Sequence, residues 1–313
     1  MIAATQQREM TSAAKVLHRH GRSFHWAAQV LSPDVRERSA RLYAICRAID
    51  DLADLPVATD ARTAAGNRLE ALQTAIRAGD THDPIVAEAA CLFAPDARAW
   101  CALEQLVVTA RADIGPVRIA DEDQLRAYAD GVAGTVGSMM ADVLDARRTA
   151  HARAAARELG IAMQYTNIAR DVLEDARCDR RYLPATWLGS AVTPATIAAG
   201  DPQARGTAWH AVELLLQRAD AAYERGWRGL AHLPPRARLG IAVAAHVYRR
   251  IGVRIRARGP HRYWQQRARV GTAGKVLASA RGLALFVRAT GTRPGNTLAA
   301  VHRAAPYTSR DGP

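Results

Sequence analysis

The chain has 313 residues, 49% apolar and 23% charged, so it can bury the core of a globular protein. No run approaches the roughly 20 apolar residues that cross a bilayer, and the N-terminus lacks the apolar core of a secretory signal. The four cysteines form no CxxC pair, which excludes a cysteine metal site of the usual spacing and indicates reduced thiols. We expect a cytoplasmic protein, either freely soluble or associated with a membrane surface.

The formal net charge is +13, from 43 basic and 30 acidic residues. Lys15 and Lys275 are the only lysines, so 41 of the 43 basic residues are arginines. A coding bias toward arginine accounts for such a composition as well as an anionic ligand, an anionic membrane or nucleic acid does. The charge alone does not choose among these.

Helix formers dominate the chain, which has only 3 Phe and 8 Tyr. A short first helix ends at Gly21, residues 23–33 read as a connection, and a long helix runs from Pro33 to Pro56. Residues 180–203 read as a loop with room for one turn of helix, and no strand is expected. Further helices are expected at about 60–78, 84–93, 96–112, 121–146, 148–178, 206–231, 235–258 and 272–289. The fold class is therefore predicted to be all-α.

Two of these helices carry paired aspartates on otherwise apolar sequence. "RAIDDLAD" places Asp50 and Asp54 four residues apart, and "NIARDVLED" does the same for Asp171 and Asp175. Residues i and i+4 share a helix face, where two like charges repel. A divalent cation relieves this repulsion, and carboxylate oxygens on adjacent turns suit Mg²⁺, which usually also binds substrate phosphates.

Each motif also contains an arginine. Arg47 precedes Asp50 by three residues, and Arg170 directly precedes Asp171. Because a guanidinium grips phosphate with two hydrogen bonds, the combination indicates a diphosphate held through metal ions. One such motif alone is weak evidence, since solvated helix faces produce many, and Arg170 with Glu174 is also the spacing of a surface ion pair. Two copies favour the metal site.

The segments "LYAICRAIDDLAD" and "QYTNIARDVLEDARCDRRYLP" resemble the two signatures of the squalene and phytoene synthase family, closest to its bacterial phytoene synthases. "HRHGRSFHWAAQVLSP", "YADGVAGTVG", "VYRRI" and "RARVGTAGKVL" resemble other parts of the same family. The resemblance implies an isoprenoid-synthase helical bundle with a central active-site cavity. The resemblance extends to about residue 285, and we expect one helical domain over residues 1–290 and a disordered tail over 291–313.

The resemblance also implies roles for individual residues. The metal ligands would be Asp50, Asp54, Asn167, Asp171 and Asp175, with Asp51 a weaker candidate. The residues that bind substrate would be His20, Ser23, Tyr43, Arg47, Gln164 and Arg170. The catalytic residues would be Tyr128, Tyr248 and Arg170, and either tyrosine could orient the leaving diphosphate or take part in proton loss. The expected metal is Mg²⁺, which Mn²⁺ could replace, and no NADPH is expected.

The implied reaction joins two geranylgeranyl diphosphates head to head, through a cyclopropyl diphosphate, to give phytoene, the first committed step of carotenoid biosynthesis. The alternatives are a squalene, dehydrosqualene or presqualene diphosphate synthase that uses farnesyl diphosphate, and a scaffold protein on the same fold. A nucleic-acid binder is disfavoured because the arginines are scattered among acidic residues. The implied partners are prenyl diphosphates and a downstream desaturase that receives the product. Residues 271–291 are apolar and basic, which suits a membrane surface, but packing on the core is the favoured use of this segment.

Three glycines in "GVAGTVG" form a further motif, with Gly131, Gly134 and Gly137 three residues apart. Glycine within a helix costs up to about 1 kcal/mol relative to alanine, so something must compensate. Two compatible explanations are close packing of helices and room for prenyl chains.

Overall fold

The computed structural model describes residues 13–53, 59–95, 97–146 and 149–268, which are almost entirely helical. Residues 13–20 form a first helix. The later α-helices are α2 (Arg22–Ala28), α3 (Pro33–Ala53), α4 (Thr59–Ala78), α5 (Pro84–Leu92), α6 (Ala99–Ala112), α7 (Glu122–Ala129), α8 (Thr135–Val143), α9 (Ala150–Arg177), α10 (Ala185–Leu188), α11 (Pro194–Ala199), α12 (Pro202–Trp227) and α13 (Pro235–Tyr263). The predicted all-α class is confirmed. None of the described helices is long and apolar enough to span a bilayer.

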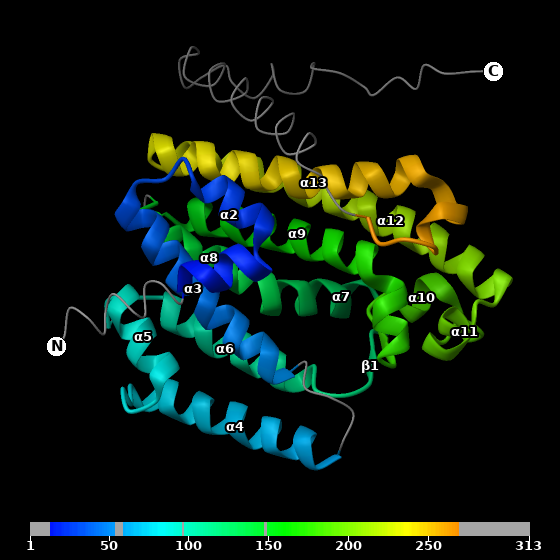
Figure 1. The fold of residues 1–313 in the computed structure, drawn as a ribbon, viewed down its shortest axis with the longest axis horizontal. Coiled ribbons are helices and arrows are strands. Elements are labelled where there is room, and N and C mark those ends of the chain that lie inside the picture. The colour runs from blue at the N-terminus through cyan, green and yellow to red at the C-terminus, as the bar shows by residue number, and fades with distance from the viewer. Residues whose placement is uncertain (1–12, 54–58, 96, 147–148, 269–313) are drawn as a thin grey trace.

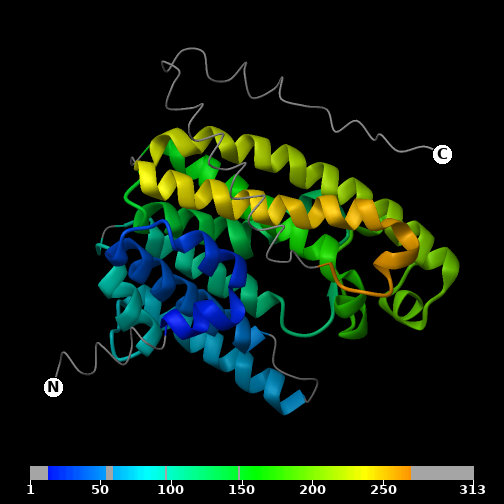
Figure 2. The ribbon, with the colours of Figure 1, turned by 45° about the horizontal axis from the view of Figure 1, so that its top comes forward.

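Helix α9 runs through the middle of the molecule, with α12 and α13 on one side and α3, α4 and α6 toward the other (Figure 1). The turned view shows α12 and α13 side by side above it (Figure 2). Thr149 caps α9 by accepting a hydrogen bond from the Ala152 amide, and its buried residues include Leu159, Ile161 and Ile168. Because α9 is packed on several sides, its remaining polar side chains can face an enclosed space.

The first acidic helix, α3, packs in a second apolar cluster with α4, α5 and α6. Leu42 and Ile49 of α3 are fully buried there against residues such as Leu72 and Leu103. Leu42, Ile45 and Ile49 recur at helical spacing, and this stripe shares its cluster with Met139 and Val143 of α8.

The close approach of α8 and α9 explains the glycine motif. A Cβ at Gly137 would lie 2.2 Å from the Ala156 carbonyl oxygen, and one at Gly160 would lie 2.0 Å from the Ala133 carbonyl oxygen. Only glycine permits backbones to pack this closely. The helix-packing explanation therefore holds, and Gly137 also lines the cavity described below.

Several predicted boundaries were wrong. Residues 22–28 form a helix rather than a connection, and the predicted helix at 121–146 is interrupted by a π-helical segment, η1 (Asp130–Gly134). Arg157 of α9 pairs with Asp130 at 2.6 and 2.8 Å at this interruption. The predicted loop at 180–203 contains α10, α11 and the strand β2 (Arg180–Arg181), which pairs in parallel with β1 (Val117–Arg118). A two-residue strand has no periodicity for the sequence to reveal.

Other predictions fall outside the described residues. These are Asp54, the helix at 272–289, the membrane-contacting segment 271–291 and the tail 291–313.

Candidate active site

A cavity of about 980 Å³ is bounded by α2, α3, α8, α9 and α13. Its lining follows α9 from Ala152 to Arg170, roughly 27 Å at 1.5 Å per residue. The N-terminal half of this stretch contributes small and apolar residues, and the C-terminal half contributes amide and charged groups. Apolar side chains line much of the remaining wall, including Leu17, Phe24, Leu31, Val136, Met140, Leu230 and Ile241. The cavity therefore combines a long apolar channel with a polar region.

The polar lining comes mainly from α3 and α9. Arg47 and Asp50 lie near the C-terminal end of α3, and Gln164, Asn167 and Arg170 recur every three residues along one face of α9. The cavity thus brings together nine of the residues predicted from the sequence: His20, Ser23, Tyr43, Arg47, Asp50, Gln164, Asn167, Arg170 and Tyr248. Tyr128, Asp171 and Asp175 are not among its lining residues.

Two arginines donate hydrogen bonds to the Asp171 carboxylate. Arg170 donates to it from Nε at 2.8 Å and from Nη2 at 2.5 Å, and Arg267, just beyond α13, donates from the same two atoms at 2.7 Å each. Burial would lower the pKa of Arg170, but its pairing with Asp171 outweighs this and raises that pKa. The second acidic motif is therefore compensated by guanidinium groups, one of them distant in sequence.

Asp175 lies one turn further along α9, in a different environment. Burial, together with the negative charge of Asp171, raises the pKa of Asp175 to about 8, although Arg180 opposes the shift. Arg180 also donates from Nη2 to the Ala53 carbonyl oxygen at 3.1 Å, at the end of α3. This contact ties the end of the first acidic helix to the segment that follows the second.

The first acidic helix presents its own charged groups. Arg47 forms an ion pair with Asp51 one turn later, and Asp50 lines the cavity. Burial raises the pKa of Tyr43 to about 12 and also raises the pKa of Tyr248, so both phenols are protonated at neutral pH. Both tyrosines can therefore donate hydrogen bonds into the cavity.

Asn167 carries a polar atom that suits a ligand. Its Nδ2 donates to Gln164 Oε1 at 3.3 Å, whereas its buried Oδ1 has no hydrogen-bond partner among the described atoms. An unpartnered buried acceptor is costly unless something occupies it. Across the described ranges, no three His, Cys, Asp or Glu side chains are grouped closely enough to hold a metal by themselves.

Tyr128 belongs to a cluster that the sequence did not reveal. Its hydroxyl donates to Asp113 at 3.1 Å, Tyr182 donates to the same carboxylate at 2.9 Å, and the two rings stack with centroids 4.7 Å apart. Tyr182 follows the second acidic motif in "RRYLP", but Asp113 has no local motif around it. Tertiary packing brings Asp113 to Tyr128, as it brings Arg267 to Asp171.

Comparison with known proteins shows where this architecture belongs. The family model for squalene/phytoene synthase matches residues 17–273. The chain belongs to the squalene/phytoene synthase family. It is similar to phytoene synthase of Pseudescherichia vulneris, with 35% identity over 295 residues covering 90% of this chain and 93% of that protein. It is also similar to 15-cis-phytoene synthase of a Paracoccus species, with 34% identity over 275 residues covering 85% and 88%.

Membership of the squalene/phytoene synthase family confirms the predicted family and the prediction that the chain is a prenyltransferase. Among solved structures, the fold is similar to that of a dehydrosqualene synthase crystallised with a ligand, with a TM-score of 0.74 and 23% identity. That match covers 89% of this chain and 96% of the other. It supports the predicted isoprenoid-synthase helical bundle.

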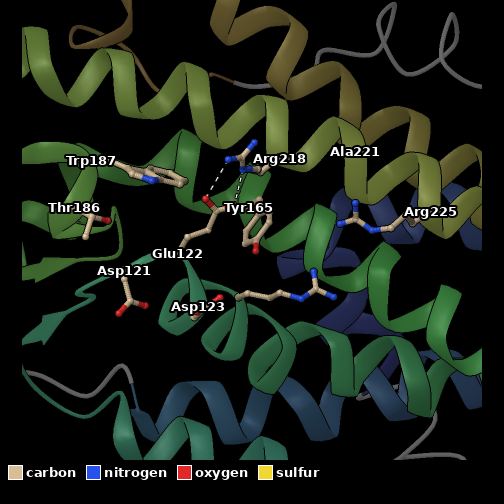
Figure 3. Close-up of a pocket in the computed structure, with 10 residues that line it drawn as sticks. Asp121, Glu122, Asp123, Tyr165, Thr186, Trp187, Arg218, Ala221 and Arg225 are labelled. Atoms are coloured by element: carbon tan, nitrogen blue, oxygen red, sulfur yellow. Dashed lines mark hydrogen bonds and ion pairs between the residues drawn. The ribbon is translucent and has the colours of Figure 1, made fainter.

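A second pocket, of about 570 Å³, lies between α7, α9, α10 and α12 (Figure 3). Its arginines are already paired: Arg218 pairs with Glu122, while Arg126 and Arg225 both pair with Glu158. Because these charges are already paired, the pocket is less suited to an anionic substrate than the larger cavity is.

Proposed function

We propose that this prenyltransferase condenses two geranylgeranyl diphosphates head to head, through a cyclopropyl diphosphate, to phytoene. The observation that carries the proposal is the cavity, in which a long apolar channel adjoins Arg47, Asp50, Asn167 and Arg170. Prenyl chains suit the channel, and diphosphates suit the polar region. The similarity to phytoene synthases favours the C20 substrate over farnesyl diphosphate.

We also propose that the acidic side chains of the two aspartate motifs hold Mg²⁺, for which Mn²⁺ could substitute. The unpartnered Asn167 Oδ1 and the Asp50 carboxylate are hard oxygen donors on facing helices, which fits such an ion. Mg²⁺ commonly takes only one or two carboxylates from the protein and completes its shell with waters and substrate phosphates, so a small protein donor set is sufficient. The further ligands would be Asp54, Asp171 and Asp175. When bound, the metal would neutralise charge on the departing diphosphate.

The protein's own residues would perform the remaining tasks. Arg47 and Arg170 would hold diphosphate oxygens, and His20, Ser23, Tyr43 and Gln164 would position the substrate at the polar wall. The apolar channel would exclude water, which would otherwise quench an allylic carbocation. The aromatic face of Tyr43 or Tyr248 would stabilise passing positive charge.

The two candidate catalytic tyrosines differ in environment. Tyr248 lines the cavity, and burial raises the pKa of its phenol, so it would donate a hydrogen bond to the leaving diphosphate. Tyr128 donates a hydrogen bond to Asp113 and does not line the cavity. We therefore assign leaving-group orientation to Tyr248 rather than to Tyr128.

The reaction needs no reductant, because phytoene forms by loss of a proton. The product is a hydrocarbon, so we propose that the protein contacts a membrane surface and passes phytoene to a desaturase.

The test is to incubate the purified protein with labelled geranylgeranyl diphosphate and Mg²⁺, without NADPH, and to identify the products by chromatography. The expected product is phytoene, with farnesyl diphosphate converted far more slowly. Efficient use of farnesyl diphosphate would instead assign the protein to the C15 enzymes. A folded protein that turned over neither substrate would support the scaffold alternative.

A further inference from the structure

The Asp171 carboxylate accepts as many hydrogen bonds as its oxygens allow. Oδ1 accepts from Nε of Arg170 and of Arg267, and Oδ2 accepts from Nη2 of each. A carboxylate offers about four lone-pair sites, so two forked guanidinium groups occupy them all. A divalent cation can bind Asp171 only if one guanidinium leaves.

Arg267 is the arginine better placed to leave. Arg170 directly precedes Asp171 on α9, and its side chain is 18% exposed, whereas the Arg267 side chain is 39% exposed and comes from the segment after α13. An exposed guanidinium is hydrated by water when it leaves its ion pair, whereas a buried guanidinium would remain a charge without a partner. Arg267 also lines the cavity, so its released side chain has polar space to enter.

The segment that carries Arg267 is itself anchored on α9. The chain bends at Gly259, whose φ of 67° favours glycine, and Pro260 follows. Tyr263 then donates from its hydroxyl to the Ala169 carbonyl oxygen at 2.7 Å, and its ring packs against Trp209 at 5.2 Å. Because the backbone is held beside α9, only the Arg267 side chain has to move.

We propose that Arg267 is a positioning residue that occupies Asp171 in the empty protein and is exchanged for a divalent cation when diphosphate binds. The positive charge of Arg170 and Arg267 opposes a lone cation, and a diphosphate removes this opposition by accepting hydrogen bonds from the released Arg267. Metal and diphosphate would therefore bind cooperatively. The inference rests on the proposed function, because it takes Asp171 as a metal ligand.

The test measures Mn²⁺ binding by electron paramagnetic resonance, with and without inorganic pyrophosphate, and does not depend on turnover. Arg267→Gln should bind Mn²⁺ about tenfold more tightly than the unaltered protein without pyrophosphate, because it lacks the competing charged hydrogen bonds. With pyrophosphate, the difference should vanish or reverse. Arg267→Lys, which keeps the charge but loses the fork, should be intermediate.

Arg262→Gln is the matched control, because Arg262 is an exposed arginine at the end of the same helix. It should bind Mn²⁺ like the unaltered protein, and circular dichroism should show that every variant is folded. Equal Mn²⁺ affinity of Arg267→Gln and the unaltered protein without pyrophosphate would overturn the exchange, while pyrophosphate-dependent Mn²⁺ binding by both would leave the proposed function intact. Absence of Mn²⁺ binding by both proteins, even with pyrophosphate, would overturn the metal assignment and the exchange together.

Discussion

Tyr128 and Tyr182 stack with ring centroids 4.7 Å apart, and both hydroxyls donate to the Asp113 carboxylate. Burial, followed by the charge of Asp113, raises the pKa of both phenols above the usual range. The two phenols therefore remain protonated, and one carboxylate fixes the orientation of a candidate catalytic tyrosine. Asp113 connects the end of α6 to α7 and to the segment after α9.

Replacing Asp113 with Ala should lower the free energy of unfolding by about 2 kcal/mol, because two phenols lose their acceptor in a largely buried site. Tyr182→Phe, which removes one donor and retains the ring, should cost less. Urea denaturation of both variants measures the difference. Equal stability of Asp113→Ala and the unaltered protein would show that the cluster contributes nothing to the fold.

A second prediction concerns the apolar channel. Val136→Phe adds a ring to the cavity wall and should reduce turnover of geranylgeranyl diphosphate at least about tenfold more than turnover of farnesyl diphosphate, because the longer chain needs the lost space. Val108→Phe is the control, since Val108 is 45% exposed on α6 and lies outside the cavity. Competition between the two substrates measures the ratio. An unchanged ratio in Val136→Phe would argue that the C20 chain lies elsewhere.

The packing of α8 on α9 predicts opposite effects at two helical glycines. Gly137→Ala should destabilise the protein by about 2 kcal/mol, because its Cβ would meet the Ala156 carbonyl oxygen at 2.2 Å. Gly66→Ala, in α4 with no neighbour within 4 Å of the added atom, should stabilise it by up to about 1 kcal/mol. Thermal melting of the two variants compares them directly. A neutral Gly137→Ala would mean that the helices separate at little cost.

The pH dependence of stability should include a contribution from Asp83. Burial would raise the pKa of this carboxyl, but hydrogen bonds from Arg68 and the Ile85 amide outweigh it and hold the pKa below its ordinary value. A depressed pKa stabilises the fold above the unfolded value, near 3.9, and this stabilisation is lost as the pH falls. Asp83→Asn should therefore cost about 1 kcal/mol at pH 7 and progressively less below about pH 4. A pH-independent difference would exclude the charge as its source.

Helical periodicity in the sequence predicted the positions of the main helices. The helix expected at 148–178 is observed as α9 (Ala150–Arg177), and the long helix expected from Pro33 is observed as α3 (Pro33–Ala53). Nine of the proposed site residues line one cavity, and most of them were implied by the resemblance to the family rather than by spacing. Helical geometry explains only why residues of one motif, such as Asn167 and Arg170, share a helix face.

The remaining features depend on contacts between distant segments. Arg267 meets Asp171 across 96 positions, and Tyr182 meets Asp113 across 69, so no local motif could reveal either pair. The π-helical segment at 130–134 likewise contacts a distant segment, since its Asp130 pairs with Arg157 of α9. Tertiary packing, rather than local propensity, therefore determines how the acidic motif on α9 is compensated.

Phytoene formation by Asp50→Asn tests the central claim most directly, because Asp50 lines the same cavity as Asn167 and the substitution removes only a charge. With geranylgeranyl diphosphate and Mg²⁺, turnover should fall at least about a hundredfold, since the leaving diphosphate would lose its metal-bound support. Asp60→Asn, at an exposed position in the first turn of α4, should retain full activity. Turnover by folded Asp50→Asn at the rate of the unaltered protein would contradict the account.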